Sequence, residues 1–361
     1  MMNKECAQDT VMQEDIEYIA RNTSLTEPLK KSTILITGAT GLIGSQVVKT
    51  LAGFNRLQNT SIRILALVRN RKKAERIFGD LLVRDDVSLV IGDVNTPLKI
   101  EENIDYIIHG ASATSSKYFV SNPVETIQTA IDGTRNVLNL AKDKEIKGVV
   151  YLSSLEVYGT VDPQAGFIDE DHYGYIDPLN VRSSYSEGKR MIECLCVSYA
   201  AEYGVPVKIA RLSQTFGAGV EYNDGRVFAE FARCVLEKRD IVLHTQGRTV
   251  RTYCYTKDAV EALLYILLKG KVGEAYNVTN METAISIKDM AFLVKKLYPE
   301  ANIEVKVDES ADQKAFGYNP EMIIKLNTNK LMELGWKPTA ALPEMFKRMI
   351  DSIRINNNIG L

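Results

Sequence analysis

The sequence predicts an α/β protein with a doubly wound parallel sheet and a smaller C-terminal lobe. Apolar runs of strand length alternate with helical stretches from residue 32 to about residue 212, which is the pattern of a parallel sheet covered by helices on both faces. After Gln214 the pattern changes to turns containing Gly and Asn, and then to short mixed elements as far as Trp336. We expect an added segment at 1–30, a sheet domain at 31–212 that includes part of 240–270, and a mainly substrate-binding lobe at 213–361.

Each expected element has a side-chain pattern that fits one geometry. The strands are short runs rich in Ile, Val and Leu that end at small or polar residues, and the helices carry apolar residues on one side. We expect strands at 34–37, 62–68, 88–91, 104–109, 149–153 and 207–210, and helices at 44–54, 123–143 and 184–203. Ahead of them, residues 14–21 have weak helical spacing, which favours a short helix packed on the body or on a partner.

The composition excludes several classes of protein. The chain has 361 residues and a net charge of −2, so no basic field points to nucleic acid. Its apolar run at 262–268 is far too short to span a membrane, and the N-terminal residues lack the apolar core of a signal peptide. The five cysteines form no metal-like pairs with His. We therefore expect no metal site, reduced thiols and a cytoplasmic protein.

Glycines break the first apolar run at three positions. Gly38 permits a tight turn from strand to helix, Gly41 lets the backbone approach a pyrophosphate, and Gly44 lets the helix pack closely on the sheet. The helix that follows offers free N–H groups and the positive end of its dipole to phosphates. This turn predicts a dinucleotide-binding (Rossmann) site. Its expected cofactor-binding residues are Gly38, Thr40, Gly41, Leu42, Ile43 and Gly44.

The end of the second strand bears on the choice of cofactor. Arg69 stands where a carboxylate would accept hydrogen bonds from an adenosine ribose, and its guanidinium suits a 2′-phosphate. This favours NADP over NAD. The alternative is a solvated basic loop, with NAD held by the backbone and Asn70. After the third strand, Asp93 could accept from the adenine amino group with Val94 beneath the ring, or it could simply cap a turn.

Small residues close the fourth strand. Ala111, Ser112 and Ala113 leave room for a nicotinamide ribose, so we expect them to contact the cofactor. His109, just before them, fits a packed histidine at a strand end better than a catalyst.

A phenol and an ammonium lie four residues apart in the stretch 184–203. Tyr185 and Lys189 therefore share one helical face, and the ammonium favours the ionised phenol because an opposite charge stabilises the anion. Ser153 or Ser154, at the end of the fifth strand, can share a substrate hydroxyl proton with Tyr185. These residues indicate a nicotinamide enzyme that moves protons and hydrides at a hydroxyl or carbonyl.

Further charged residues indicate how a substrate would be held. A carboxylate at Glu156 would lie close to a sugar C5, for acid–base work or to hold water, unless it is only a solvated loop residue. Arginine forks suit a bidentate grip on a diphosphate. For any one of the arginines, a surface ion pair is the alternative. The candidates are Arg182, Arg211, Arg226 and Arg251.

Together these residues resemble the nucleotide-sugar epimerase/dehydratase group of the extended short-chain dehydrogenases/reductases. The resemblance runs from about residue 31 to 353 and includes the glycine turn, the Tyr-x-x-x-Lys pair, the strand-five hydroxyl and the basic residue at 251. Within the group, the chain most resembles the UDP-glucuronate decarboxylases. The stretches that carry this closer resemblance are 168–178, 182–190, 224–227 and 334–338.

The resemblance implies a role for each matching residue. Tyr185, as the phenolate, would remove the C4 hydroxyl proton while the C4 hydride passes to the nicotinamide of bound NAD(P). Lys189 would lower the pKa of Tyr185 and hold the ribose, and Ser154 takes the place of the usual threonine. Glu156 would accompany loss of CO2 from the transient 4-keto sugar, and hydride return would give UDP-xylose. Arg251 would hold the diphosphate or the carboxylate.

The resemblance also implies a substrate pocket and a partner. The substrate-binding residues would be Tyr118, Arg182, Gln214, Arg226 and Arg251. The nucleotide sugar is then the small-molecule partner. Such proteins commonly form homodimers through the helices expected here at 123–143 and 184–203.

Four positions depart from the pattern of the group. Leu155 stands where 4,6-dehydratases have an aspartic acid that protonates the leaving hydroxyl, so dehydration is disfavoured. Ala130 and Gln214 each replace an asparagine, and Arg69 replaces an acidic residue. The alternatives to decarboxylation are a 4- or 5-epimerase, an NADPH-dependent 4-keto-sugar reductase, and a cofactor-binding protein without catalysis.

Overall fold

A seven-stranded sheet forms the centre of the first part of the molecule. The computed structural model describes residues 3–113, 115–308 and 321–359. The strand order is β11-β7-β5-β4-β1-β2-β3 and every pairing is parallel, which confirms the doubly wound sheet. The strands are β1 (Thr33–Thr37), β2 (Arg63–Val68), β3 (Val87–Ile91), β4 (Tyr106–His109), β5 (Gly148–Ser154), β7 (Val207–Leu212) and β11 (Ala275–Val278). The order reverses beside β1, which leaves a ligand crevice at the carboxyl ends of β1 and β4.

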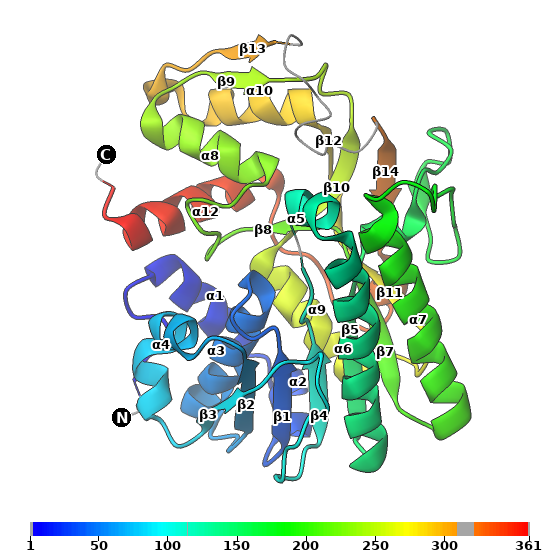
Figure 1. The fold of residues 1–361 in the computed structure, drawn as a ribbon. Coiled ribbons are helices and arrows are strands. Elements are labelled where there is room, and N and C mark those ends of the chain that lie inside the picture. The colour runs from blue at the N-terminus through cyan, green and yellow to red at the C-terminus, as the bar shows by residue number, and fades with distance from the viewer. Residues whose placement is uncertain (1–2, 114, 309–320, 360–361) are drawn as a thin grey trace.

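Helices cover both faces of this sheet. On one face α6 (Pro123–Asp143) and α7 (Ser183–Tyr203) pack against each other, and on the other face α3 (Leu42–Gln58) packs against α9 (Thr256–Lys269) (Figure 1). The short α4 (Arg71–Phe78) follows β2. Helix α6 has the predicted bounds because Pro123 opens it. Helix α7 ends at Gly204, which adopts a left-handed conformation with φ 70°.

The second part of the molecule lies above the first in Figure 1, beyond the carboxyl ends of the strands. Its main sheet has the order β12-β10-β14-β6, with β8 beside β10. The strands are β6 (Phe167–Ile168), β8 (Gln214–Phe216), β9 (Ile241–Leu243), β10 (Val250–Tyr255), β12 (Asn280–Ser286), β13 (Val305–Val307) and β14 (Ile323–Leu326). The helices α8 (Val227–Glu237), α10 (Ile287–Leu297) and α12 (Leu342–Asn357) enclose an apolar core with these strands.

The chain passes between the two parts more than once. Helix α9 and strand β11 follow residue 213 in the sequence, yet α9 covers the first sheet and β11 forms its edge beside β7. Residues after 213 thus contribute to both parts. The expected division of the chain into domains at residues 212 and 213 stays a prediction. Short helices α5 (Ser116–Ser121) and α11 (Asn329–Met332) lie in the connections. None of the described helices combines the length and the apolar character needed to cross a membrane.

The N-terminal segment forms two helices, where the sequence predicted one. Helix α1 (Thr10–Ala20) begins four residues before the predicted position because the Asp9 carboxylate accepts from the backbone N–H of Met12 at 3.0 Å. Helix α2 (Thr23–Leu29) follows at once. Helix α1 packs on α3 and α9 of the first part and on α12 of the second. The segment therefore connects the two parts.

A buried carboxylate lies at the centre of this connection. Asp15 accepts from the hydroxyl of Tyr255 at 2.5 Å and forms an ion pair with Arg348 at 2.9 Å. Burial raises the pKa of Asp15 to about 6, although the bonds from Tyr255 and Arg348 act in the opposite direction. Ionised Asp15 is therefore only partly compensated.

We predict that Asp15→Asn changes how stability depends on pH. The pKa of Asp15 is higher in the folded chain than in the unfolded chain, so its protonation stabilises the fold at low pH and this contribution is lost as pH rises through about 6. Relative to Asp15→Asn, the wild type should lose about 2 kcal/mol between roughly pH 4 and pH 6. Urea unfolding across this range measures the difference. Asp143→Asn, at an exposed carboxyl, is the control and should show a constant difference.

Candidate active site

The glycine turn lies at the carboxyl end of β1 and approaches other backbone closely. Gly38 has φ 67°, and a Cβ on it would lie 2.6 Å from the carbonyl carbon of Gly110. A Cβ on Gly44 would lie 2.2 Å from the carbonyl oxygen of Gly38. Gly41 precedes α3, which begins at Leu42. The free N–H groups of α3 therefore point into the crevice without side chains in the way, as a pyrophosphate requires.

The rest of the turn lies in the same place. Thr40 and Ile43 are half-buried between the glycines, and Ile43 also packs against the core under α3. Their assignment as cofactor-binding residues stays a prediction.

The strand ends next to the turn carry Arg69 and Asp93. These two side chains form an exposed ion pair at 3.8 Å. Asn70 caps α4 by accepting from the backbone N–H of Lys73 at 3.0 Å. The Asp93 carboxylate accepts from Asn95 at 3.0 Å within a turn. Val94 is buried. The assignment of Asp93 and Val94 to an adenine stays a prediction.

His109 is part of the core. Its Nδ1 pairs with the hydroxyl of Thr37 at 2.6 Å and its Nε2 with Thr134 at 3.0 Å. Burial, with the nearby charge of Lys189, lowers its pKa to about 3, so the ring is neutral. Small residues follow: the backbone N–H of Ala111 donates to Thr37 at 3.2 Å, and Ser112 and Ala113 are half-buried.

Tyr185 and Lys189 lie on the face of α7 that packs against the end of β5. The Lys189 ammonium donates to the carbonyl of Leu152 at 2.7 Å and lies 5.6 Å from the centre of the Tyr185 ring. Phe119 of α5 stacks on that ring, with the centroids 4.2 Å apart. Ser154 hydrogen-bonds to Tyr185. The structure thus brings together the three residues expected to move the proton.

Lys189 is not among the groups that shift the pKa of Tyr185 most, so the expectation that it lowers this pKa stays a prediction. Burial and the neighbouring Glu156 raise the pKa of Tyr185, and the bond from Ser154 opposes this only in part. Burial also lowers the pKa of Lys189 to about 8.

Glu156 forms a partly buried ion pair beside Tyr185. Its carboxylate accepts from Arg182 at 2.7 Å and from Ser186 at 3.0 Å. The Arg182 guanidinium also lies 4.9 Å over the ring of Phe119. Its Nε and Nη1 are buried and have no hydrogen-bond partner among the residues that the structure describes. Two donors of Arg182 are therefore available to a ligand at this point.

The second part of the molecule contributes further candidates. Gln214 opens β8 and pairs with Tyr253 of β10, the strand that carries Arg251. The buried Nε of Arg251 lacks a partner within the described part of the chain. Arg226 pairs with Asp224 at 2.6 Å. The Arg226 charge also acts on Tyr185, so the two lie near each other.

Tyr118 and Arg211 lie in different surroundings. Tyr118 is exposed on α5, next to Phe119. Arg211 is buried and its Nη2 pairs with Glu193 at 2.6 Å. The same Nη2 also donates to the hydroxyl of Tyr173, and Nη1 donates to that of Tyr158. The interpretation of Arg211 as a substrate anchor is therefore wrong, because its donors are already occupied within the fold.

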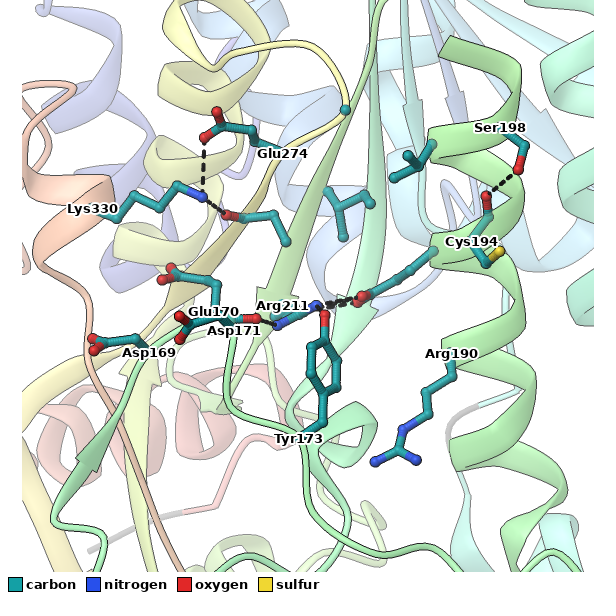
Figure 2. Close-up of a pocket in the computed structure, with 15 residues that line it drawn as sticks. Asp169, Glu170, Asp171, Tyr173, Arg190, Cys194, Ser198, Arg211, Glu274 and Lys330 are labelled. Carbon is teal, nitrogen blue, oxygen red and sulfur yellow. Dashed lines mark hydrogen bonds and ion pairs between the residues drawn. The ribbon is translucent and has the colours of Figure 1, made fainter. Parts of the chain in front are cut away.

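A separate cavity lies on the outer side of α7. It has a volume of about 830 Å³ and lies between α7, β7 and the start of β11 (Figure 2). Charged side chains of both signs line it, among them Glu170, Arg190, Arg211 and Lys330. The described residues that line it include none of the expected catalytic residues. It is not the crevice at the ends of β1 and β4.

The cysteines and acidic residues give no sign of a built metal site. All five cysteines are free. Asp169, Asp171 and His172 have ligand atoms within 4.8 Å of one another, but all three are exposed. The expectation of no metal stays a prediction.

Two residues of the site were missed from the sequence. Phe119 could not have been found, because nothing in its local pattern indicates contact with Tyr185. Glu193 could have been found: it lies four residues after Lys189, on the same face of α7. It is buried and bonded to Ser153 of β5 at 2.5 Å.

The family of the chain follows from comparison with known proteins. The family model described as "NAD dependent epimerase/dehydratase family" matches residues 34–279. The chain belongs to this family. The match begins at the glycine turn and runs through Tyr185 and Arg251 to the end of β11.

Named relatives are similar over most of this family member. UDP-glucuronic acid decarboxylase 3 from Arabidopsis thaliana is 30% identical over 340 residues, which cover 94% of this chain and 93% of that protein. UDP-glucuronic acid decarboxylase 1 from Xenopus tropicalis is 30% identical, over 89% of this chain and 72% of that protein.

Solved structures of the family share the fold. UDP-glucose 4-epimerase from Thermotoga maritima, solved with UDP-glucose, has a TM-score of 0.74 at 20% identity and covers 90% of this chain and 99% of that chain. UDP-glucuronic acid 4-epimerase from Bacillus cereus, solved with UDP-glucuronic acid and NAD, has a TM-score of 0.73 at 19% identity and covers 89% and 99%. At these identities the likeness establishes the fold alone.

We predict that Gly38→Ala weakens NAD binding by more than tenfold. The added methyl needs an unfavourable backbone conformation and also meets the backbone at Gly110. Gly166→Ala is the matched control, because Gly166 has φ 71° and a methyl added there would have nothing within 4 Å. The control should cost about 1 kcal/mol of stability and leave NAD affinity unchanged. Calorimetric titration with NAD measures the affinity of both variants. Equal losses of NAD affinity in the two variants would contradict the assignment of Gly38 to the cofactor site.

Proposed function

We propose that the enzyme decarboxylates a UDP-linked uronic acid, most simply UDP-glucuronate, through a transient 4-keto intermediate. The observation that carries this proposal is Arg182, whose buried Nε and Nη1 have no hydrogen-bond partner among the described residues and whose guanidinium lies over Phe119, the ring stacked on Tyr185. A substrate carboxylate would accept a charge-assisted hydrogen bond from this guanidinium. The similarity to UDP-glucuronic acid decarboxylases over about nine-tenths of the chain supports it.

Each group at the end of β5 has a role in the proposed decarboxylation. Bound oxidised nicotinamide supplies the hydride acceptor and a positive charge. Tyr185 takes the proton of the C4 hydroxyl through a hydrogen bond shared with Ser154. The C4 carbonyl then accepts the electron pair released when the C5–carboxylate bond breaks and CO2 leaves. A proton at C5 and hydride return at C4 complete the product and restore the cofactor. Glu156, which is paired with Arg182, would hold the proton or water for C5.

Leu155 supports decarboxylation over dehydration. It follows Ser154 directly and is 2% exposed in an apolar cluster with Val157 and Tyr158. A leucine cannot protonate a leaving hydroxyl, so the step that defines a 4,6-dehydratase lacks its acid here.

Purified protein should convert UDP-glucuronate to CO2 and a UDP-pentose without added cofactor. Mass spectrometry of the nucleotide product, with CO2 trapping, measures this. Tyr185→Phe should lower kcat at least about a hundredfold, because the general base is lost. A UDP-uronic acid with inverted C4 and no CO2 would instead identify an epimerase. Consumption of NADPH on a 4-keto sugar, without turnover of UDP-glucuronate, would identify a reductase.

The variant Arg182→Met tests whether Arg182 binds the substrate carboxylate. It should weaken UDP-glucuronate binding by about 10- to 100-fold, because a charge-assisted pair is lost. UDP-glucose, which lacks the carboxylate, is the control ligand and should lose little. Equal losses for both ligands would mean that Arg182 does not bind the carboxylate.

We also propose that Arg69 favours NADP over NAD. The guanidinium is 73% exposed in a long pair with Asp93, which leaves it free to meet a 2′-phosphate, and the position lacks the carboxylate that a free ribose would use. The ratio of NADP to NAD affinity should fall by at least about tenfold in Arg69→Asp. The Lys73→Ala variant, two residues inside α4, controls for general loss of basic charge. Preference for NAD in the wild type, unchanged in Arg69→Asp, would overturn this assignment.

We propose that the protein is a homodimer in a reducing, cytoplasmic compartment. Exposed apolar side chains on α6 and α7 give the two helices a face suited to a second copy; they are Val124, Ile127, Met191 and Val197. The five free cysteines suit a compartment that keeps thiols reduced.

A further inference from the structure

We infer that Glu193 is a positioning residue for the reaction: it fixes the end of β5 against α7 and sets a carboxylate close to the Lys189 ammonium. The role of Glu193 in turnover rests on the proposed function. Its contacts and its effect on the charge of Lys189 do not depend on that function. Among the described residues, Glu193 hydrogen-bonds to Ser153 and Arg211 and not to Tyr185, Ser154 or Glu156, so it acts through its neighbours.

Three consecutive residues of β5 bond to three residues of α7. The carbonyl of Leu152 accepts from Lys189 at 2.7 Å. The Ser153 hydroxyl donates to Glu193 at 2.5 Å, and Ser154 hydrogen-bonds to Tyr185. The α7 residues are four apart and share one face. Glu193 therefore provides one of three links between the end of the strand and the catalytic helix.

Glu193 is itself held by an arginine from the neighbouring strand. Arg211 of β7 donates from Nε and Nη2 to the carboxylate, at 2.6 Å for the closest contact. Arg211 also donates to the carbonyl of Glu170 at 2.6 Å and to the hydroxyl of Tyr158 at 2.9 Å. Figure 2 shows Arg211 reaching into the wall of the outer cavity, bonded on both sides. The pair joins α7 to β5 and β7 at once, and both side chains are buried.

The carboxylate also opposes the cost of burying the Lys189 charge. Burial lowers the pKa of Lys189, whereas Glu193 and, to a lesser degree, Cys196 raise it. The other titratable groups around the ammonium are Tyr185 on its own helix, Tyr151 of β5 and the neutral His109 of β4. Of these groups, Glu193 has the largest effect in favour of the charged lysine. Without it the lysine would lose its proton at a lower pH.

The test reads the charge of Lys189 directly. Enzyme labelled with nitrogen-15 lysine is titrated by NMR, and the Lys189 signal is identified by its absence in Lys189→Met. In Glu193→Gln, Lys189 should titrate about one pH unit lower than in the wild type. Glu202→Gln, which removes a carboxylate farther along α7, should leave the titration unchanged. An unchanged titration in Glu193→Gln would overturn the proposal, since a merely structural role would not move it.

A second variant covers the case in which Glu193→Gln does not fold. Removing one member of a buried pair leaves an uncompensated charge, whereas removing both is far milder. Glu193→Gln/Arg211→Met should therefore fold, and Lys189 should again titrate lower than in the wild type. If Lys189 titrated at the wild-type pH in this double variant, the proposed effect of Glu193 on the charge of Lys189 would be overturned.

Kinetics test the positional part separately. Ser153→Ala keeps the carboxylate but removes its bond to β5, so kcat should fall about tenfold with the Lys189 titration unchanged. In Glu193→Gln the alkaline limb of the kcat profile should move to lower pH. An unaltered kcat in Ser153→Ala would overturn positioning. If the wild type fails to decarboxylate UDP-glucuronate, the proposed function fails, while the NMR titration still decides the role of Glu193.

Discussion

The bonds between the end of β5 and one face of α7 are the constraint on which the site depends. Tyr185, Lys189 and Glu193 lie one helical turn apart, and each reaches a different one of three consecutive strand residues. A helix that slid by one residue along the strand would lose all three bonds. The catalytic helix is therefore fixed by the same contacts that pack it, and Arg211 fastens that packing from β7.

Burial controls the chemistry of these groups as strongly as charge does. It raises the pKa of Tyr185 and lowers that of Lys189 to about 8, so each is pushed toward its neutral form in the protein without ligands. Two charge pairs, the partly buried Glu156 with Arg182 and the buried Glu193 with Arg211, lie nearby. The first pair leaves donors of Arg182 unused, and the second has every nitrogen of Arg211 engaged. This difference separates a residue that can bind substrate from one that holds the fold.

Much of the framework could be predicted because its causes are local. The glycine turn could be predicted because two backbone segments can approach closely only where a residue has no side chain. The structure shows such close backbone approaches at Gly38 and Gly44. Helix α6 was predicted at its observed bounds because Pro123 opens it. Helix α2 and the early start of α1 were missed, since a cap such as Asp9 is a weak signal without the surface against which the helix packs.

The sequence by itself determined the fold class, the family and the pairing of a phenol with an ammonium on one helical face. These depend on periodicity and spacing, which the order of residues contains. Only the tertiary structure decided which charged residues are free. Arg182 and Arg211 look alike in the sequence, yet Arg211 meets Glu193 across two elements and Arg182 keeps two donors open. Such choices depend on contacts between residues far apart in the chain, and on how fully each group is removed from water.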